Sequence, residues 1–150
     1  MSVSLYGSGQ TILQVVQTVI TTSFSTNSTS WVSTGFTASI TPQSTNSKIM
    51  IMVNGTVSNS NNGGVGSLTV FRGTTSGTNL SSSSHGFGFV YVNLGYNTVA
   101  PFSLNYLDSP ATTSATTYTL AMHQENSGTT SYFNQTPCTA TITLLEVSGS

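Results

Sequence analysis

Charged side chains are almost absent from this chain, and their absence argues against several functions. Only 3% of the 150 residues are charged, against about 25% in ordinary globular domains. The chain has no basic patch of the kind that binds phosphate backbones, and no basic amphipathic segment of the kind that lies on anionic membranes. We therefore expect neither nucleic acid nor a membrane as a partner. The five charged residues are Lys48, Arg72, Asp108, Glu125 and Glu146.

Long apolar runs and cysteine pairs are also missing. No run approaches the roughly 18 apolar residues that a membrane-spanning helix needs. The N-terminus has neither the basic stretch nor the apolar core of a signal peptide. Cys138 is the only cysteine, so no disulfide can form within the chain. We expect Cys138 to be a small buried hydrophobic residue.

The densest apolar stretch is residues 48–57, and it has the pattern of a β-strand. Ile49, Ile51 and Val53 alternate along one face, which is the period of a strand with a buried side. Met50 and Met52 make the opposite face apolar as well. A strand that is apolar on both faces needs cover on both sides. We therefore predict a central strand with the core on one face and a second partner on the other.

The rest of the chain continues in short segments rich in Val, Ile, Thr and aromatic residues, with polar turns between them. In residues 12–24 apolar side chains also recur four apart, so a helix is the competing interpretation there. Pro101 falls inside one segment and predicts an edge strand or a bulge. About eight to ten strands without a long helical pattern indicate an all-β fold, an antiparallel, jelly-roll-like β-sandwich. The expected strands are residues 12–24, 31–40, 48–57, 68–72, 86–92, 98–107, 118–122 and 138–147, with short ones near 80 and 132.

The order of these segments predicts two parts of unequal size. Residues 1–11 carry Val3, Leu5 and Tyr6 ahead of a glycine-rich joint, which indicates an N-terminal arm. Residues 12–150 show no change of composition and no strong repeat, which indicates a single β-sandwich domain.

Catalytic and metal-binding patterns do not emerge from the sequence. His85 and His123 are the only candidate bases, and no Gly-x-Ser-x-Gly turn supplies a nucleophile beside them. Asp108 is expected to cap a turn, and Glu125 and Glu146 to be turn or edge charges. Neither a zinc set of Cys and His nor a calcium set of carboxylates is present. We therefore expect no enzyme activity, no catalytic residue, no metal and no cofactor.

The tyrosines allow two interpretations. They could stack on sugars in a receptor-binding site, or they could fill the core and a subunit interface, where tyrosine is enriched. The second interpretation is favoured for most of them. Tyr96, between Gly95 and Asn97 in an expected turn, is the best candidate for an exposed ring.

Several stretches together resemble a known group of proteins. These stretches are Leu13-Gln-Val-Val-Gln17, Trp31 with Gly35-Phe36, Ala38-Ser-Ile-Thr-Pro42, Ser47-Lys48-Ile49, Phe71-Arg72-Gly73-Thr74, Tyr106-Leu107-Asp108-Ser-Pro110, Thr117-Tyr118-Thr-Leu120 and Thr143-Leu-Leu-Glu146-Val147. Their order over residues 12–147 resembles virion structural proteins of tailed phages with trimeric jelly-roll or C1q-like domains. That group includes capsid decoration proteins and tail-fibre knobs. The resemblance implies a fold and a place in the virion, and it contains no catalytic motif.

The resemblance and the size of the chain lead to one expected function. No shaft precedes the globular part, so we expect a homotrimeric decoration or cement protein on the capsid exterior, bound to the major capsid protein. In this expectation Met50 and Met52 form the trimer interface, while Val3, Leu5 and Tyr6 anchor the protein to the capsid. The alternative is a receptor-binding knob of a tail fibre that recognises host surface glycans through loops 58–66, 73–86 and 94–98.

Overall fold

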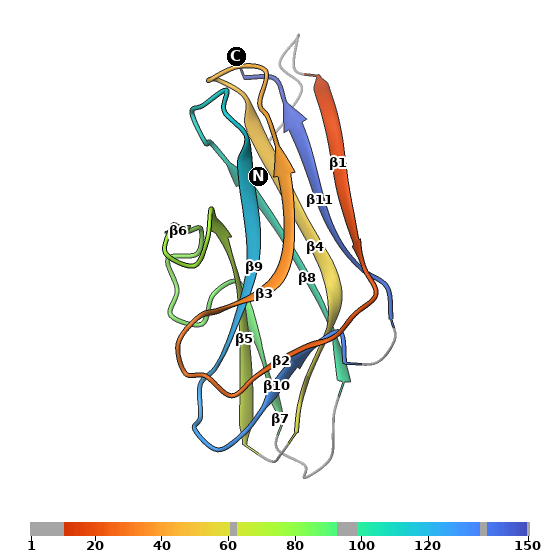
Figure 1. Cartoon of the computed structure of the whole chain (residues 1–150), viewed down its shortest axis with the longest axis vertical. Helices are drawn as coiled ribbons and strands as arrows, with labels where there is room; N and C mark the ends of the chain where they lie inside the picture. The colour runs from red at the N-terminus through yellow and green to blue at the C-terminus, as the bar shows by residue number, and fades with distance from the viewer. Residues whose placement is uncertain (1–10, 61–62, 93–98, 136–137, 150) are drawn as a thin grey trace, which may run out of the picture.

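The computed structural model describes residues 11–60, 63–92, 99–135 and 138–149, which form eleven strands and no helix. Accordingly, this part of the chain has no helix of the length and apolarity that crossing a membrane requires. The strands form two antiparallel sheets that pack face to face (Figure 1). The predicted all-β, antiparallel sandwich is confirmed.

The larger sheet, which we call sheet A, is organised around its longest strand. That strand, β4 (Lys48–Asn59), lies between β8 (Val99–Asp108) and β11 (Ala140–Val147), and β1 (Ile12–Ile20) forms the edge beyond β11. Where β11 leaves β4, the short strand β10 (Ser131–Phe133) takes its place, and β2 (Phe24–Thr26) pairs with β10. The central position predicted for β4 is therefore observed.

The second sheet, sheet B, has the order β3-β9-β5. It contains β3 (Val32–Ile40), β9 (Thr116–Gln124) and β5 (Gly64–Arg72). The outer edge of β5 is shared by β6 (Thr78–Asn79) and β7 (Gly88–Val92). The described strands cross between the sheets from β2 to β3, from β3 to β4, from β4 to β5, from β7 to β8, from β8 to β9 and from β9 to β10. Crossings of this kind are how a jelly roll joins two sheets around one core.

Alternating burial along β11 and the first half of β4 builds the sheet A side of that core, whereas β5 and β9 of sheet B are buried along almost their whole length. On β4 the odd-numbered residues Ile49, Ile51 and Val53 are buried, while the even-numbered Met50 and Met52 are half-buried on the other face. Side chains of alternate residues point to opposite faces of a sheet, so one face of each sheet fills the space between them. The core also contains Leu68, Val70, Tyr118, Leu120, Met122, Phe133, Ala140, Ile142 and Leu144.

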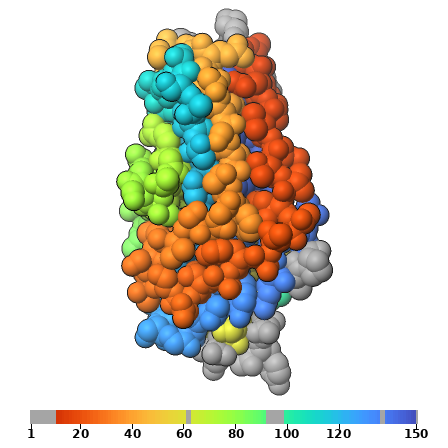
Figure 2. Space-filling view, viewed as in Figure 1, coloured from red at the N-terminus to blue at the C-terminus, as the bar shows by residue number. Residues whose placement is uncertain are grey.

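Residues 12–24 are extended but are not one strand. The segment breaks after Ile20, and its second half runs across the lower part of the molecule toward β3 (Figure 2). This excludes the helical interpretation. Pro101 lies in β8, which pairs only with β4 among the described strands, so the edge position predicted from that proline is confirmed.

The region predicted as a polar loop after residue 57 is instead largely strand. β4 continues through Ser58 to Asn59, and both side chains are buried. Asn59 is held by a polar network, in which the Ser131 Oγ donates to its Oδ1 at 2.5 Å and its Nδ2 donates to the Val90 carbonyl at 2.9 Å. Gln124 Nε2 also donates to Ser131 Oγ at 2.8 Å. Buried polar groups with partners avoid the cost of desolvation, which is why polar residues here do not form a loop.

Asp108 also departs from expectation, since it is buried between the sheets instead of capping a turn. The Tyr118 hydroxyl donates to Asp108 Oδ2 at 2.8 Å, and Arg72 Nε lies 3.4 Å from the same oxygen. Burial, together with the hydrogen bond to Asp108, raises the pKa of Tyr118 far above its usual range. Three residues from both sheets thus meet at one carboxylate oxygen, where a charge without partners would be costly.

Glu146 is likewise buried, which corrects its prediction as a turn or edge charge. It belongs to the inward-facing set of β11. Its carboxylate accepts hydrogen bonds from Gln14 Nε2 at 2.5 Å and from the backbone N–H of Gln43 at 2.7 Å. It therefore joins the edge strand β1 and the turn before β4 to the end of β11. Sequence alone could not reveal these partners, because they lie more than 100 residues away.

Cys138 was predicted to be buried and is exposed. It precedes β11, whose inward-facing set begins at Ala140. Its carbonyl accepts a hydrogen bond from Asn134 Nδ2 at 2.9 Å. The residue therefore precedes the core strand β11 and is not part of it.

The buried, hydrogen-bonded carboxylate of Glu146 predicts how the stability of the fold changes at acidic pH. Burial alone would raise the pKa of Glu146, but hydrogen bonds, among them those from Gln14 and from the Gln43 backbone, outweigh burial and lower the pKa below its ordinary value of 4.5. A group whose pKa is lowered by folding stabilises the fold above its unfolded pKa, and that stabilisation is lost as pH falls through the folded value. We expect the free energy of unfolding to decrease as pH falls from about 5 to about 3.

The measurement is urea unfolding across this pH range for the wild type and Glu146→Gln. The glutamine variant keeps the shape but does not titrate, so its stability should depend less on pH over the same interval. Equal pH dependence in both proteins would contradict the role assigned to the Glu146 carboxylate.

Candidate functional site

The outward face of sheet A carries a continuous apolar row across four strands. Val15 of β1 pairs with Leu145 of β11, Leu145 pairs with Met50 of β4, and Met50 pairs with Leu107 of β8. Val15 is 58% exposed and Leu107 is 39% exposed. No described strand lies across this face (Figure 1). We call these four residues the apolar row.

The next row along the same face is mostly polar. Met52 lies between Thr143 of β11 and Asn105 of β8, and Thr143 accepts a hydrogen bond from Gln17 Nε2 at 2.9 Å. Both predicted interface residues, Met50 and Met52, therefore face away from the core, as expected. Met50 belongs to an apolar surface and Met52 to a polar one, a difference that the sequence of β4 does not show. Their role in a trimer stays a prediction.

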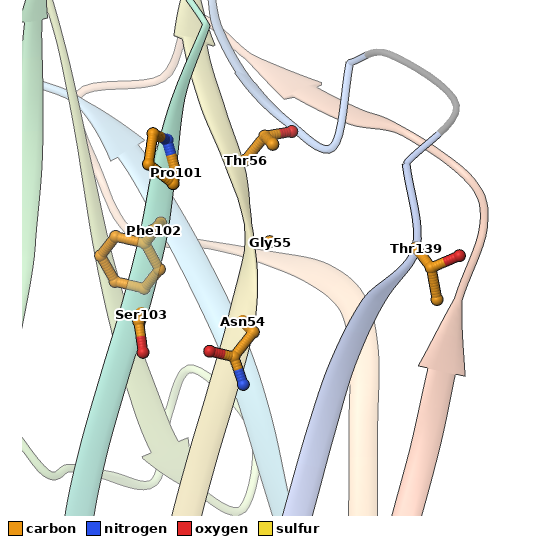
Figure 3. Close-up of a pocket in the computed structure, with 7 residues that line it drawn as sticks. All are labelled: Asn54, Gly55, Thr56, Pro101, Phe102, Ser103 and Thr139. Carbon is orange, nitrogen blue, oxygen red and sulfur yellow. The ribbon is translucent and has the colours of Figure 1, made fainter.

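Farther along this face is an open depression of about 440 Å³. Figure 3 shows Gly55 on β4, Ser103 and Pro101 on β8, and Thr139 opposite them, beyond the place where β11 separates from β4. Gly55 faces inward, and a Cβ there would lie 2.5 Å from the Phe133 ring. The absence of a side chain at Gly55 therefore lets the Phe133 ring reach the underside of β4.

Other predicted site residues fall outside the described residues. This applies to the anchor residues Val3, Leu5 and Tyr6, and to Tyr96 with loop 94–98. Loop 58–66 proves to contain the end of β4 and the start of β5 in its described part, so it is not the exposed loop that was expected.

Sheet B brings His85 close to His123 and Glu125, which lie two residues apart in a distant part of the sequence. Glu125 Oε1 accepts a hydrogen bond from Ser67 Oγ at 2.6 Å. The same oxygen lies 3.0 Å from His123 Nε2 and 3.8 Å from His85 Nε2. The Trp31 ring lies against the His123 ring, with centroids 4.0 Å apart. Nothing in the sequence spacing indicated this cluster, because it depends on the pairing of β5 with β9.

This cluster is not arranged as a nucleophile with its base. Ser67 donates to the carboxylate and not to an imidazole, so neither histidine is placed to take its proton. The other two carboxylates, Asp108 and Glu146, are buried elsewhere in the sandwich. Among the residues that the structure describes, no group of three or more His, Cys, Asp or Glu side chains is arranged to hold a metal ion.

Two aromatic rings beside the cluster face solvent. Phe89 is 54% exposed and Tyr91 is 52% exposed. Both belong to β7, two residues apart, so they lie on one face of the strand. Phe87, which the alternation of aromatic residues in the expected strand 86–92 places on the same face, packs instead against the core beside Tyr106. In contrast, Tyr118 is fully buried, as the core interpretation of the tyrosines predicted.

Comparisons with models of protein families and with curated protein sequences found no match. Among solved structures, the chain is similar to a mutant VP2 protein of infectious bursal disease virus in derived T=1 particles. The two share 14% sequence identity with a TM-score of 0.48, and the match covers 100% of this chain and 41% of that chain. The chain is also similar to the Gt strain of the same virus, at 15% identity and a TM-score of 0.44, covering 98% and 44% of the two chains. The chain spans less than half the length of these structures, and the likeness carries no functional conclusion.

Gly55 gives a direct test of the packing below the depression. Gly55→Ala should lower the free energy of unfolding by about 1–3 kcal/mol, because the added Cβ would collide with the buried Phe133 ring. Chemical unfolding of the purified protein measures this loss. Ser103→Ala, an exposed change on the neighbouring strand, should stay within about 0.5 kcal/mol of the wild type. Equal stability of Gly55→Ala and the wild type would contradict this close contact.

Proposed function

We propose that the chain is a structural subunit that self-associates through the outward face of sheet A. In this proposal three copies form a decoration or cement protein on the exterior of a phage capsid, bound to the major capsid protein. The observation that supports self-association is the apolar row of Val15, Leu145, Met50 and Leu107. This row crosses β1, β11, β4 and β8 of sheet A, and no described strand covers it.

The dimensions of the face support an interface between subunits. Four strands are roughly 15 Å wide, and a strand of the length of β4 extends roughly 40 Å. This surface is of the same order as the roughly 800 Å² that each partner contributes to a stable interface. Exposed contiguous apolar surface on a protein commonly marks such a contact.

The distribution of charge supports association by packing. Asp108 and Glu146 are buried, Arg72 is paired with Asp108 between the sheets, and Glu125 has its partners on sheet B. Among the residues that the structure describes, Lys48 is thus the one charged residue on the outward face of sheet A, at the start of β4. Contact across this face would come from apolar packing, so the association should depend little on salt.

The number of copies and the place in the virion come from the resemblance to phage virion proteins. The same resemblance supports Val3, Leu5 and Tyr6 as the capsid anchor. A protein that binds only the assembled shell shifts the equilibrium away from disassembly, which is how a cement protein would act. On this proposal the chain is not an enzyme and needs no cofactor.

The second candidate function is a tail-fibre knob that binds host glycans. One specific observation favours it, namely the exposed rings of Phe89 and Tyr91 beside polar side chains. Immunogold labelling of intact particles separates the two functions. Label over the head supports the decoration protein, whereas label confined to the tail tip would exclude it.

Charge substitutions test the subunit interface. We expect Met50→Asp and Met52→Asp to convert the trimer into a folded monomer, because burying a carboxylate without a partner in a contact surface costs several kcal/mol. In the monomer these side chains face solvent, so the fold should remain. Light scattering gives the number of chains, and circular dichroism during heating reports the fold.

Two controls distinguish the interface from a general effect of charge. Met50→Leu keeps an apolar side chain of similar volume and should keep the trimer. Ser76→Asp places the same charge in an exposed turn of sheet B and should also keep it. A wild-type protein that is a clean monomer, or a trimer that survives both aspartates, would refute the proposed interface.

Particle stability tests the cementing role. Heads that lack the protein should release their DNA at a lower temperature than complete heads, because the stabilising contribution of binding is lost. Fluorescence of a DNA-binding dye during heating measures the release. Adding back the purified protein should restore the release temperature, and adding back a version without residues 1–11 should not. Identical release with and without the protein would rule out cementing.

A further inference from the structure

The outward face of sheet B carries a second surface, opposite the proposed subunit interface. Its centre is the pair of exposed rings on β7, and polar and ring-bearing groups from four other segments surround it. We call it the aromatic patch. It consists of Phe89, Tyr91, His85, Glu125, His123, Ser67 and Trp31.

Strand register places these residues together. Ser67 of β5 pairs with His123 of β9 on one side and with Phe89 of β7 on the other. Val65 pairs with Tyr91, and its carbonyl accepts a hydrogen bond from the Glu125 N–H at 2.9 Å. The two rings are therefore neighbours on one face, roughly 7 Å apart along β7, with the carboxylate in the adjacent row.

The polar groups of the patch are held in place. Ser84 Oγ lies 3.0 Å from His85 Nδ1, and the His85 ring packs against Phe89 with centroids 5.3 Å apart. The other ring nitrogen of His85, Nε2, faces the Glu125 carboxylate. The contacts of that carboxylate with Ser67, His123 and His85 are all made by Oε1. Its Oε2 can accept a further hydrogen bond.

This combination of groups matches a sugar better than an anion. Aromatic faces pack against the apolar C–H surface of a pyranose ring, and carboxylate and imidazole groups pair with its hydroxyls. The chain has only two basic side chains other than histidine. Lys48 lies on sheet A, and Arg72 is paired with Asp108, so neither supplies a counter-charge to an acidic ligand.

It also matches a sugar better than an apolar protein surface. A protein covering Phe89 and Tyr91 would bury the Glu125 carboxylate as well, at a cost that only matched donors can offset. Sugar hydroxyls supply such donors, and the carboxylate can keep contact with water at the rim. The two rings in a row fit successive units of an extended chain of sugars.

We infer that the aromatic patch binds a neutral oligosaccharide, with Phe89 and Tyr91 as stacking platforms and with Glu125 and His85 as hydrogen-bonding partners. The inference does not depend on the trimer, because the patch lies on the other sheet. It adds a binding activity that a decoration protein or a fibre knob could each use.

A glycan array probed with the full-length protein identifies the ligand, and titration calorimetry with the best neutral oligosaccharide gives its affinity. We expect Phe89→Ala and Tyr91→Ala each to weaken binding roughly tenfold, because each removes one stacking surface. The double variant should show no measurable binding. Glu125→Gln should weaken binding less, since an amide oxygen can still accept a hydrogen bond.

Ser76→Ala, a truncation in an exposed turn of sheet B away from the patch, is the control and should bind as the wild type does. Light scattering on the same samples shows whether the oligomeric state is unchanged, so failure of this inference is separate from failure of the proposed trimer. Three results would overturn the inference: no neutral glycan binds, only acidic glycans bind, or the double variant binds normally. If Phe89→Ala or Tyr91→Ala changed the number of chains in the oligomer, the patch would be a contact between copies of the protein. That result would also overturn the inference.

Discussion

The alternation of side chains along β4 is the constraint on which the rest of the molecule depends. This strand pairs with β8 along one side and with β11 and then β10 along the other. Because neighbouring residues of a strand face opposite ways, fixing Ile51 in the core also fixes Met50 on the outward face. A register shift of one residue would expose the buried set and bury the methionines. The same pairing aligns Val15, Leu145 and Leu107 with Met50, so the apolar row follows from the packing of the core.

Because charge is scarce, the role of each buried carboxylate can be named. Asp108 gathers Tyr118 and Arg72 from sheet B at the end of β8, and Glu146 joins β1 and the turn before β4 to β11. Both carboxylates act within the sandwich and have close partners, as buried charges require. The surface is left to Ser, Thr, Asn and apolar residues. Contacts with other molecules must then rely on packing, ring stacking and hydrogen bonds.

The two sheets have outward faces of different chemistry. Sheet A presents a flat apolar row that suits a second copy of the same chain. Sheet B presents two aromatic rings next to a carboxylate and two imidazoles, which suits a ligand with both apolar and hydroxyl surfaces. A jelly roll separates such faces by the full thickness of the sandwich, so the two surfaces can be occupied at the same time.

The sequence by itself determined the fold class, the positions of most strands, the central place of β4, the edge position of Pro101 and the outward direction of Met50 and Met52. These features depend on local periodicity and on properties of single residues, which a sequence shows directly. Tertiary structure alone decided that Asn59, Asp108 and Glu146 are buried, that Cys138 is exposed, and that His85, His123 and Glu125 meet at one oxygen. Burial of a polar group depends on whether a partner arrives from a distant strand. The register of β5 with β7 and β9, and of β1 with β11, supplies those partners only once the chain is folded.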